Sequence, residues 1–162
     1  MRSQYIYPIL IFFPVLVIQT TIIPLISING VIPDLIIILL VFYTLRNGQI
    51  YGTVLGFIYG LLFDLITGSL LGSSMLAKSL AGFVAGYFAN ENKIEIYFKS
   101  YNFALIVLLC SVINSVINAF FSSVEFNSNL FVMIFQLGLL PGLYTSVVSL
   151  ISIVFYPRRN FT

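Results

Sequence analysis

Three charged side chains lie inside apolar stretches of the sequence: Asp34, Asp64 and Lys78. Two carboxylates that face one substrate could perform general acid–base chemistry. A carboxylate beside an ammonium group would instead form an ion pair. A charge at the centre of a membrane helix costs about 2.5–3.5 kcal/mol, so such groups usually face protein or water. These three residues are the first candidates for a site.

No catalytic set accompanies these charges in the sequence. The chain has no His, and its single cysteine, Cys110, lies in an apolar run. No nucleophile stands beside a base, and there is neither a metal-ligand cluster nor a phosphate-binding loop. We therefore expect a protein that is not an enzyme and that binds no cofactor or metal.

The composition indicates which class of chain positions these residues. Of 162 residues, 60% are hydrophobic and 7% are charged, and the mean hydropathy is +1.09. Soluble domains carry about 25% charged residues, so we predict an integral membrane protein. The net charge of +2 and the absence of long Lys or Arg runs argue against a nucleic-acid partner.

Six apolar segments are candidates to cross the membrane as helices. Their polarity does not alternate as it would in a transmembrane barrel. We therefore predict an all-α integral membrane protein, a compact bundle of six transmembrane helices that forms a single domain over 1–162. The predicted spans are 5–23, 33–46, 49–66, 69–89, 101–123 and 129–156.

The basic residues predict the orientation. With six spans, the connections 24–34, 67–69 and 122–128 share one side and contain no Lys or Arg. By the positive-inside rule, both termini are then cytoplasmic. The basic residues on the predicted cytoplasmic side are Arg2, Arg46, Lys93, Lys99, Arg158 and Arg159.

Glycines at four-residue intervals lead to the two charges of the third and fourth spans. One stripe is Gly52, Gly56, Gly60 and Asp64, and the other is Lys78, Gly82 and Gly86. Residues four apart share a helix face, and small residues let helices approach closely. Antiparallel packing predicts three facing pairs: Asp64 with Lys78, Gly60 with Gly82, and Gly56 with Gly86.

Other interpretations of these residues stay open. Asp34 is either a third member of the predicted ion pair or a solvated N-cap residue. Lys78 could extend to the interface along its stem. The glycine stripes could serve only to pack the third span on the fourth.

Further polar residues gather toward the side opposite the termini: Gln19, Asn114, Asn118 and Gln136. They predict either a polar cavity open to the outside or hydrogen bonds between helices that hold the bundle together.

Residues 33–88 resemble the rod shape-determining protein MreD family. The resemblance is carried by a Pro-Asp start to a span, a Gly-Leu-x-x-Asp motif, and glycines in the following turn and span. In this chain these elements are Pro33-Asp34, Gly56, Gly60-Leu61, Asp64, Gly68, Gly72, Gly82 and Gly86.

The resemblance implies a non-enzymatic scaffold subunit of the bacterial cell-elongation complex in the inner membrane. Its implied partners are an MreC-like single-span protein, membrane lipid and, indirectly, the MreB filament, the RodA glycosyltransferase and a penicillin-binding transpeptidase. The implied fold is similar to the substrate-binding subunits of energy-coupling-factor transporters. The alternative function is therefore the substrate-binding subunit of such a vitamin importer.

Overall fold

A computed structural model describes residues 3–28, 30–90, 101–123 and 139–155. Within these ranges the chain is all-α, as predicted, with six α-helices and one short 3-10 helix. The elements are α1 (Ser3–Thr21), η1 (Ile23–Ile26), α2 (Leu35–Asn47), α3 (Gln49–Thr67), α4 (Ser73–Tyr87), α6 (Asn102–Ser123) and α8 (Leu140–Phe155).

Two helical segments are long and apolar enough to cross a membrane by length and composition: Gln49–Thr67 and Asn102–Phe121. Shorter apolar segments lie within α1, α2 and α8. Of the predicted span 129–156, residues before 139 lie outside the described residues, and with them Gln136. The six membrane crossings and the single domain over 1–162 stay predictions.

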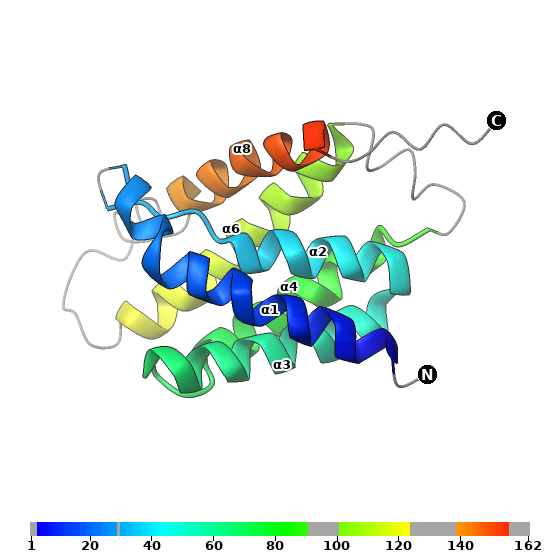
Figure 1. Cartoon of the computed structure of the whole chain (residues 1–162), viewed down its shortest axis with the longest axis horizontal. Helices are drawn as coiled ribbons and strands as arrows, with labels where there is room; N and C mark the ends of the chain where they lie inside the picture. The colour runs from blue at the N-terminus through cyan, green and yellow to red at the C-terminus, as the bar shows by residue number, and fades with distance from the viewer. Residues whose placement is uncertain (1–2, 29, 91–100, 124–138, 156–162) are drawn as a thin grey trace.

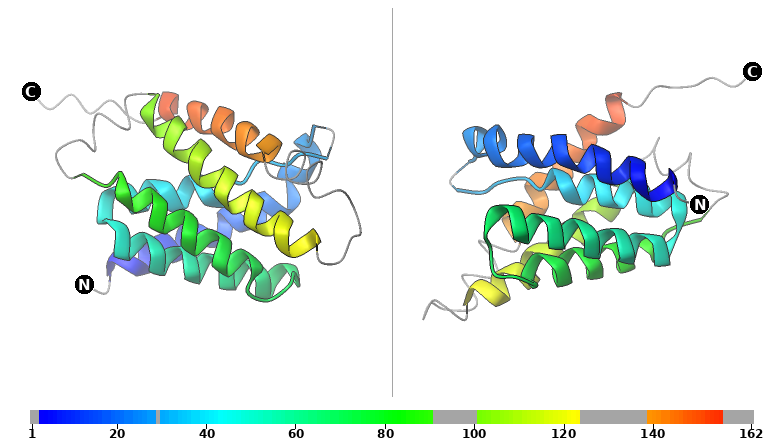
Figure 2. Two further views of the ribbon diagram at one scale, coloured as in Figure 1. Left: turned by 180° about the vertical axis from the view of Figure 1, so that it is seen from behind. Right: turned by 60° about the horizontal axis from the view of Figure 1, so that its bottom comes forward.

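Successive helices run in opposite directions through the bundle (Figures 1 and 2). The start of α1 and the end of α8 therefore lie at the same end of the molecule. The α3–α4 loop, the end of α6 and the start of α8 lie at the opposite end (Figure 1). An even number of membrane crossings requires the first helix to begin and the last helix to end on the same side, as α1 and α8 do here.

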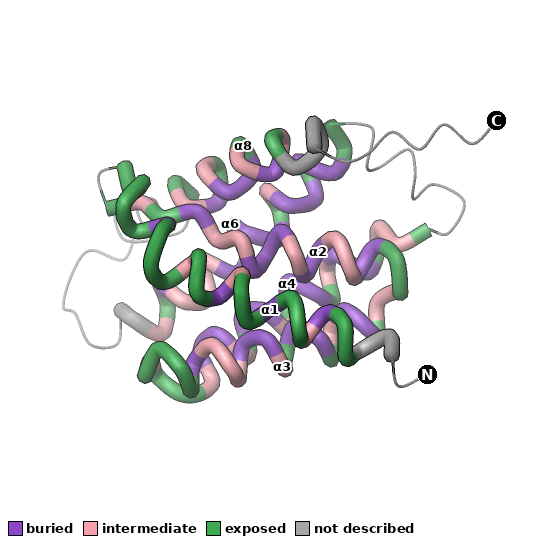
Figure 3. The backbone as a smooth tube through the Cα atoms, in the orientation of Figure 1, coloured by how far each residue is buried: buried purple, intermediate pink, exposed green. Residues whose placement is uncertain are grey.

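Helix α2 is the centre of the bundle and packs against each of the other five α-helices. It is apolar on all sides, as expected of a helix with no face toward water. Ile36, Ile37, Leu40 and Val41 are fully buried in the main hydrophobic cluster. Figure 3 shows α2 buried or half-buried along its length, with exposed residues only at its end. The start of α2 is thus a point that every other helix can reach.

Helices α3 and α4 form the most extensive helix pair, and glycines make it possible. A Cβ atom on Gly56 would overlap the carbonyl of Lys78, and one on Gly60 would overlap the backbone of Ser74 and Met75. These helices therefore meet backbone to backbone, as their small-residue stripes predicted.

The predicted register of this pair is wrong. Gly82 faces Gly52, and Gly86 faces Gln49, so the glycines of the two stripes do not meet in the predicted pairs. Each contact is displaced by about eight residues along one helix, or roughly 12 Å at the α-helical rise. The displacement separates Lys78 from Asp64, and each of these side chains contacts other groups.

The loop between α3 and α4 explains the shift. The predicted connection, 67–69, is too short, because α4 begins only at Ser73. Gly68 and Gly72 both adopt left-handed conformations, with φ of 68° and 105°. Glycine takes such conformations without steric cost, and the chain between these two glycines turns back beside the end of α3. The first turn of α4 consequently lies next to Asp64 rather than beyond it.

Candidate functional site

Asp34 caps the start of α2 and holds two other helices at the same time. Its Oδ1 accepts hydrogen bonds from the backbone N–H groups of Ile36 and Ile37, at 3.0 and 3.2 Å. Its Oδ2 accepts from Lys78 Nζ of α4 at 3.3 Å and from Asn114 Nδ2 of α6 at 3.2 Å. A carboxylate has about four acceptor positions, and here all four are occupied.

Backbone groups on either side of Asp34 bind the remaining outer helices. The Asp34 N–H donates to Thr145 Oγ1 of α8 at 3.0 Å. Gln19 of α1 donates through Nε2 to the Pro33 carbonyl at 2.8 Å and accepts at Oε1 from the Leu35 N–H at 2.9 Å. The side-chain amide of Gln19 therefore satisfies backbone groups that the start of a helix leaves free.

Helix α3 contributes an aromatic ring to the same place. Lys78 Nζ lies 4.8 Å from the centre of the Phe63 ring, within the range of a cation–π contact. All six helices thus meet within a few residues of Asp34. We call this set the Asp34 hub: Gln19, Asp34, Phe63, Lys78, Asn114 and Thr145.

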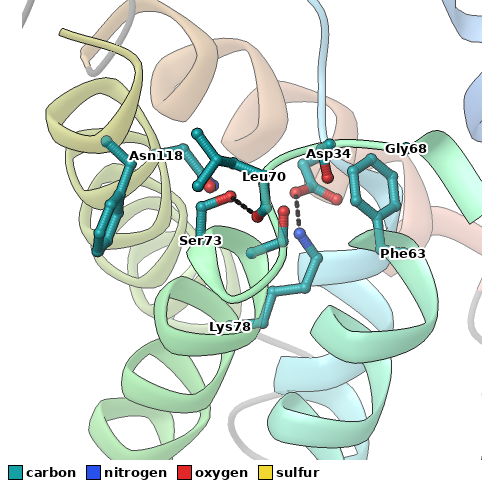
Figure 4. A pocket seen from close by; sticks show the side chains of 10 residues that line it. Asp34, Phe63, Gly68, Leu70, Ser73, Lys78 and Asn118 are labelled. Carbon is teal, nitrogen blue, oxygen red and sulfur yellow. Dashed lines mark hydrogen bonds and ion pairs between the residues drawn. The ribbon is translucent and has the colours of Figure 1, made fainter. Parts of the chain in front are cut away.

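Lys78 is paired with Asp34 and not with Asp64. The Lys78 residue is 2% exposed, so its ammonium does not extend to an interface. The Asp34 side chain is 21% exposed and is the accessible member of the pair (Figure 4). Asp34 is also the N-cap residue of α2, as one interpretation predicted, but it is paired with Lys78 rather than solvated. It is not a third member of a Lys78–Asp64 pair, because that pair does not form.

Asp64 has a separate role at the start of α4. It is 1% exposed and accepts hydrogen bonds from Ser69 Oγ at 2.8 Å, the Gly72 N–H at 2.9 Å and the Met75 N–H at 3.4 Å. Gly72, the N-cap residue of α4, has no side chain with which to accept these bonds. The carboxylate of Asp64 supplies the missing cap from the preceding helix, where it also complements the helix dipole.

A polar cavity adjoins the hub. It consists of two hollows, of about 630 and 360 Å³, which both touch Asp34, Phe63 and Asn118. The larger one reaches Lys78 and the α3–α4 loop, as Figure 4 shows. The smaller one reaches Gln19 and Asn114. Three of the four residues expected around a cavity therefore line this one, and Gln136 lies outside the described residues.

One polar atom at this site stays unsatisfied. Asn114 Oδ1 is buried and has no hydrogen-bond partner among the residues that the structure describes. The orientation of the amide follows from its neighbour, because the carboxylate of Asp34 only accepts and so requires the NH₂ group. The carbonyl oxygen is then turned away from Asp34.

Sequence reasoning missed two members of the hub, Phe63 and Thr145. Phe63 directly precedes Asp64, but an aromatic residue in an apolar helix gives no sign that it contacts a cation. Thr145 is buried and also donates to the Pro141 carbonyl one turn earlier. A lone threonine in a membrane helix usually makes only that local bond, so no pattern marked it.

The arrangement is suited to holding helices rather than to chemistry. The two carboxylates are occupied by different donors and face different partners. No group of three His, Cys, Asp or Glu residues that could hold a metal occurs within the described part of the chain.

Comparisons with known proteins give one match. No curated protein and no solved structure matches the chain, so the predicted similarity to energy-coupling-factor subunits has no support. The family model for rod shape-determining protein MreD matches residues 1–158. The chain belongs to the MreD family, whose members are non-enzymatic membrane proteins that act in rod-shape determination.

Proposed function

We propose that this protein is a scaffold subunit of the bacterial cell-elongation complex, which binds an MreC-like single-span protein and helps to direct peptidoglycan synthesis. The observation that carries the proposal is the family match, because it extends over 1–158 and so covers almost the whole chain. The MreB filament, the RodA glycosyltransferase and a penicillin-binding transpeptidase would be reached through that partner.

The glycine stripes do not supply the partner surface in this proposal. Gly52, Gly56, Gly60, Gly82 and Gly86 are all occupied by contacts within the chain. Exposed apolar side chains at helical spacing remain on α1 and α4. They are Ile6, Leu10, Phe13 and Val17 on α1, and Leu76, Leu80, Phe83 and Tyr87 on α4. A single partner helix could pack along either row by apolar contact.

The bundle would lie in the bacterial inner membrane as a multi-pass protein with both termini in the cytoplasm. The end of the molecule that carries the Asp34 hub would then face outward. A rigid hub at that end suits a scaffold, because it fixes the relative positions of the surfaces that partners contact.

Co-purification tests this function. The chain is co-expressed with an affinity-tagged MreC-like single-span protein, and an unrelated single-span protein with the same tag is the control. We expect the chain to be retained with the MreC-like protein at near-equal amounts and lost with the control. Equal retention by both baits would contradict a specific scaffold role.

Substitutions in the exposed apolar rows of α1 and α4 would then show which row contacts the partner. Leu10→Ala with Phe13→Ala tests the α1 row, and Leu80→Ala with Phe83→Ala tests the α4 row. The variant that loses the partner while keeping its own thermal stability identifies the contact.

A further inference from the structure

We propose that the polar cavity beside the Asp34 hub binds a neutral polyhydroxyl group, supplied by a sugar-bearing lipid or by a free sugar. This inference goes beyond the scaffold role and does not depend on it. It rests on the donors and acceptors that the hub leaves unused, on the charge balance of the cavity and on its size.

The two adjoining hollows offer one donor and one acceptor: Lys78 lines the larger hollow and Asn114 the smaller one. Asn114 Oδ1 is a buried acceptor without a partner among the described residues. The Lys78 ammonium carries three N–H groups, and Asp34 Oδ2 is its one oxygen acceptor in the part of the chain that the structure describes. Both nitrogens, Lys78 Nζ and Asn114 Nδ2, contact the same oxygen of Asp34. Asp34 itself lines both hollows.

The charges of the site favour a neutral ligand. A cation would have to bind Asp34, whose acceptor positions are already taken by two backbone N–H groups, Lys78 and Asn114. An anion would meet the carboxylate of Asp34, which is the more exposed member of the ion pair. Hydroxyl groups carry no net charge. One hydroxyl of a polyhydroxyl ligand can accept from Lys78 in the larger hollow while another donates to Asn114 in the smaller one.

The size and walls of the cavity suit a sugar-sized group. The larger hollow, of about 630 Å³, lies within the range of small-ligand pockets, which are about 300–1,000 Å³. Phe63 touches both hollows, and Phe121 and Leu70 line the larger one. Aromatic and apolar walls with a few fixed polar groups are the usual construction of such sites.

The test measures the thermal stability of the purified full-length chain in an amine-oxide detergent. Detergents with sugar headgroups are avoided because they would compete for the site. The probes are a glucosyl diacylglycerol, a diacylglycerol with the same acyl chains, and free glucose. With the glucosyl lipid at several times its Kd, we expect Tm to rise by about 2–4 °C, and not to rise with the diacylglycerol.

Three variants test whether the rise in Tm depends on the cavity. Asn118→Phe fills the region that both hollows share and leaves the contacts of Asp34 in place. Asn114→Leu removes the unpaired acceptor. Leu109→Phe is the matched control, since Leu109 lies on the same helix with its side chain exposed. We expect the first two variants to lose the Tm response and the control to keep it.

The outcomes distinguish a lipid headgroup from a free sugar, and two of them would overturn the proposal. A response to the glucosyl lipid alone supports a lipid headgroup, and an equal response to glucose supports a free sugar. Equal stabilisation by the glucosyl lipid and the diacylglycerol would overturn the proposal, as would a full response in Asn118→Phe. None of these results depends on partner binding, so they are distinct from a failure of the scaffold role.

Discussion

Removing Lys78 and removing Asp34 have different consequences for the residue that remains. Without Lys78, Asp34 keeps three of its four donors and part of its exposure to solvent. Without Asp34, Lys78 is a buried ammonium whose remaining described contact is the Phe63 ring. The pair is therefore asymmetric, and its two halves respond differently to substitution.

Asp34→Asn is the more damaging change by this argument. Removing one partner of a buried ion pair typically costs about 3–5 kcal/mol, because the other charge stays unpaired. We expect Lys78→Met to cost clearly less, and the double variant Asp34→Asn/Lys78→Met to be more stable than Asp34→Asn alone. Reversible unfolding in mixed micelles measures the free energies.

The control for this cycle is Asp64→Asn, which should combine additively with Lys78→Met because Asp64 contacts other donors. A double variant of Asp34 and Lys78 no more stable than Asp34→Asn would show that the two charges do not stabilise each other. Coupling of Lys78 to Asp64 instead would restore the pairing that the sequence first predicted.

Asp64→Ala tests the cap of α4. The substitution leaves the part-buried N–H groups of Gly72 and Met75 without their acceptor, which costs about 1–3 kcal/mol. Ser69→Ala removes only one donor to Asp64 and should cost about 1 kcal/mol or less. Hydrogen exchange supplies the local readout: the Gly72 and Met75 amides should exchange faster in Asp64→Ala. Unchanged exchange at both amides would exclude the capping role.

At the scale of helices, the glycines decide how closely α3 and α4 pack. Gly60→Ala would gain up to about 1 kcal/mol in helix propensity. The added Cβ, however, would overlap the backbone of Ser74 and Met75, which cannot rotate away as a side chain could. Overpacking costs about 1–3 kcal/mol, so the steric effect wins and the variant should unfold more easily. Thermal unfolding of the detergent-purified protein measures the loss.

Val54→Leu is the matched control for this substitution. Val54 lies on the same helix and its side chain is exposed, so a larger residue meets no backbone. We expect an unfolding temperature within about 2 °C of the parent. A Gly60→Ala variant as stable as the control would mean that α3 and α4 are not in backbone contact at this point.

The sequence predicted the helices better than the contacts between them. Mostly apolar runs indicate α2, α3 and α6, because a helix in lipid must satisfy its own backbone. The register of α3 on α4 could not be predicted, because it depends on how the loop from Gly68 to Gly72 turns back. The partner of Lys78 could not be predicted for the same reason: a shift of about two helical turns exchanges one carboxylate for another.

Asp34 shows what a short motif can and cannot indicate. A Pro-Asp step before an apolar run predicts a helix start with a capping carboxylate. It does not predict that Lys78 and Asn114 will reach the second oxygen of that carboxylate, because those contacts depend on three-dimensional packing. The candidate residues were therefore identified more reliably than their partners.

At the scale of the whole molecule, the up-and-down order of the helices gives the bundle two distinct ends. The α2–α3 connection lies at the end where α1 begins, and the segment before α2 lies at the end of the Asp34 hub (Figure 1). Arg46 belongs to the first end. The positive-inside rule then predicts that the first end is cytoplasmic and that the hub faces outward.

Cysteine labelling tests this orientation in intact cells. Cys110 is buried and is first replaced by alanine, so that each variant carries a single thiol. Ser27→Cys places a thiol near the hub end, and Asn47→Cys places one at the α2–α3 connection; both parent residues are exposed. A membrane-impermeant maleimide should label Ser27→Cys in intact cells and label Asn47→Cys only after the membrane is opened. Ser27 precedes α2 and Asn47 is its last residue. The reverse labelling pattern would therefore mean that the bundle has the opposite orientation and that the polar cavity faces the cytoplasm. Labelling of both sites in intact cells would instead mean that α2 does not cross the membrane.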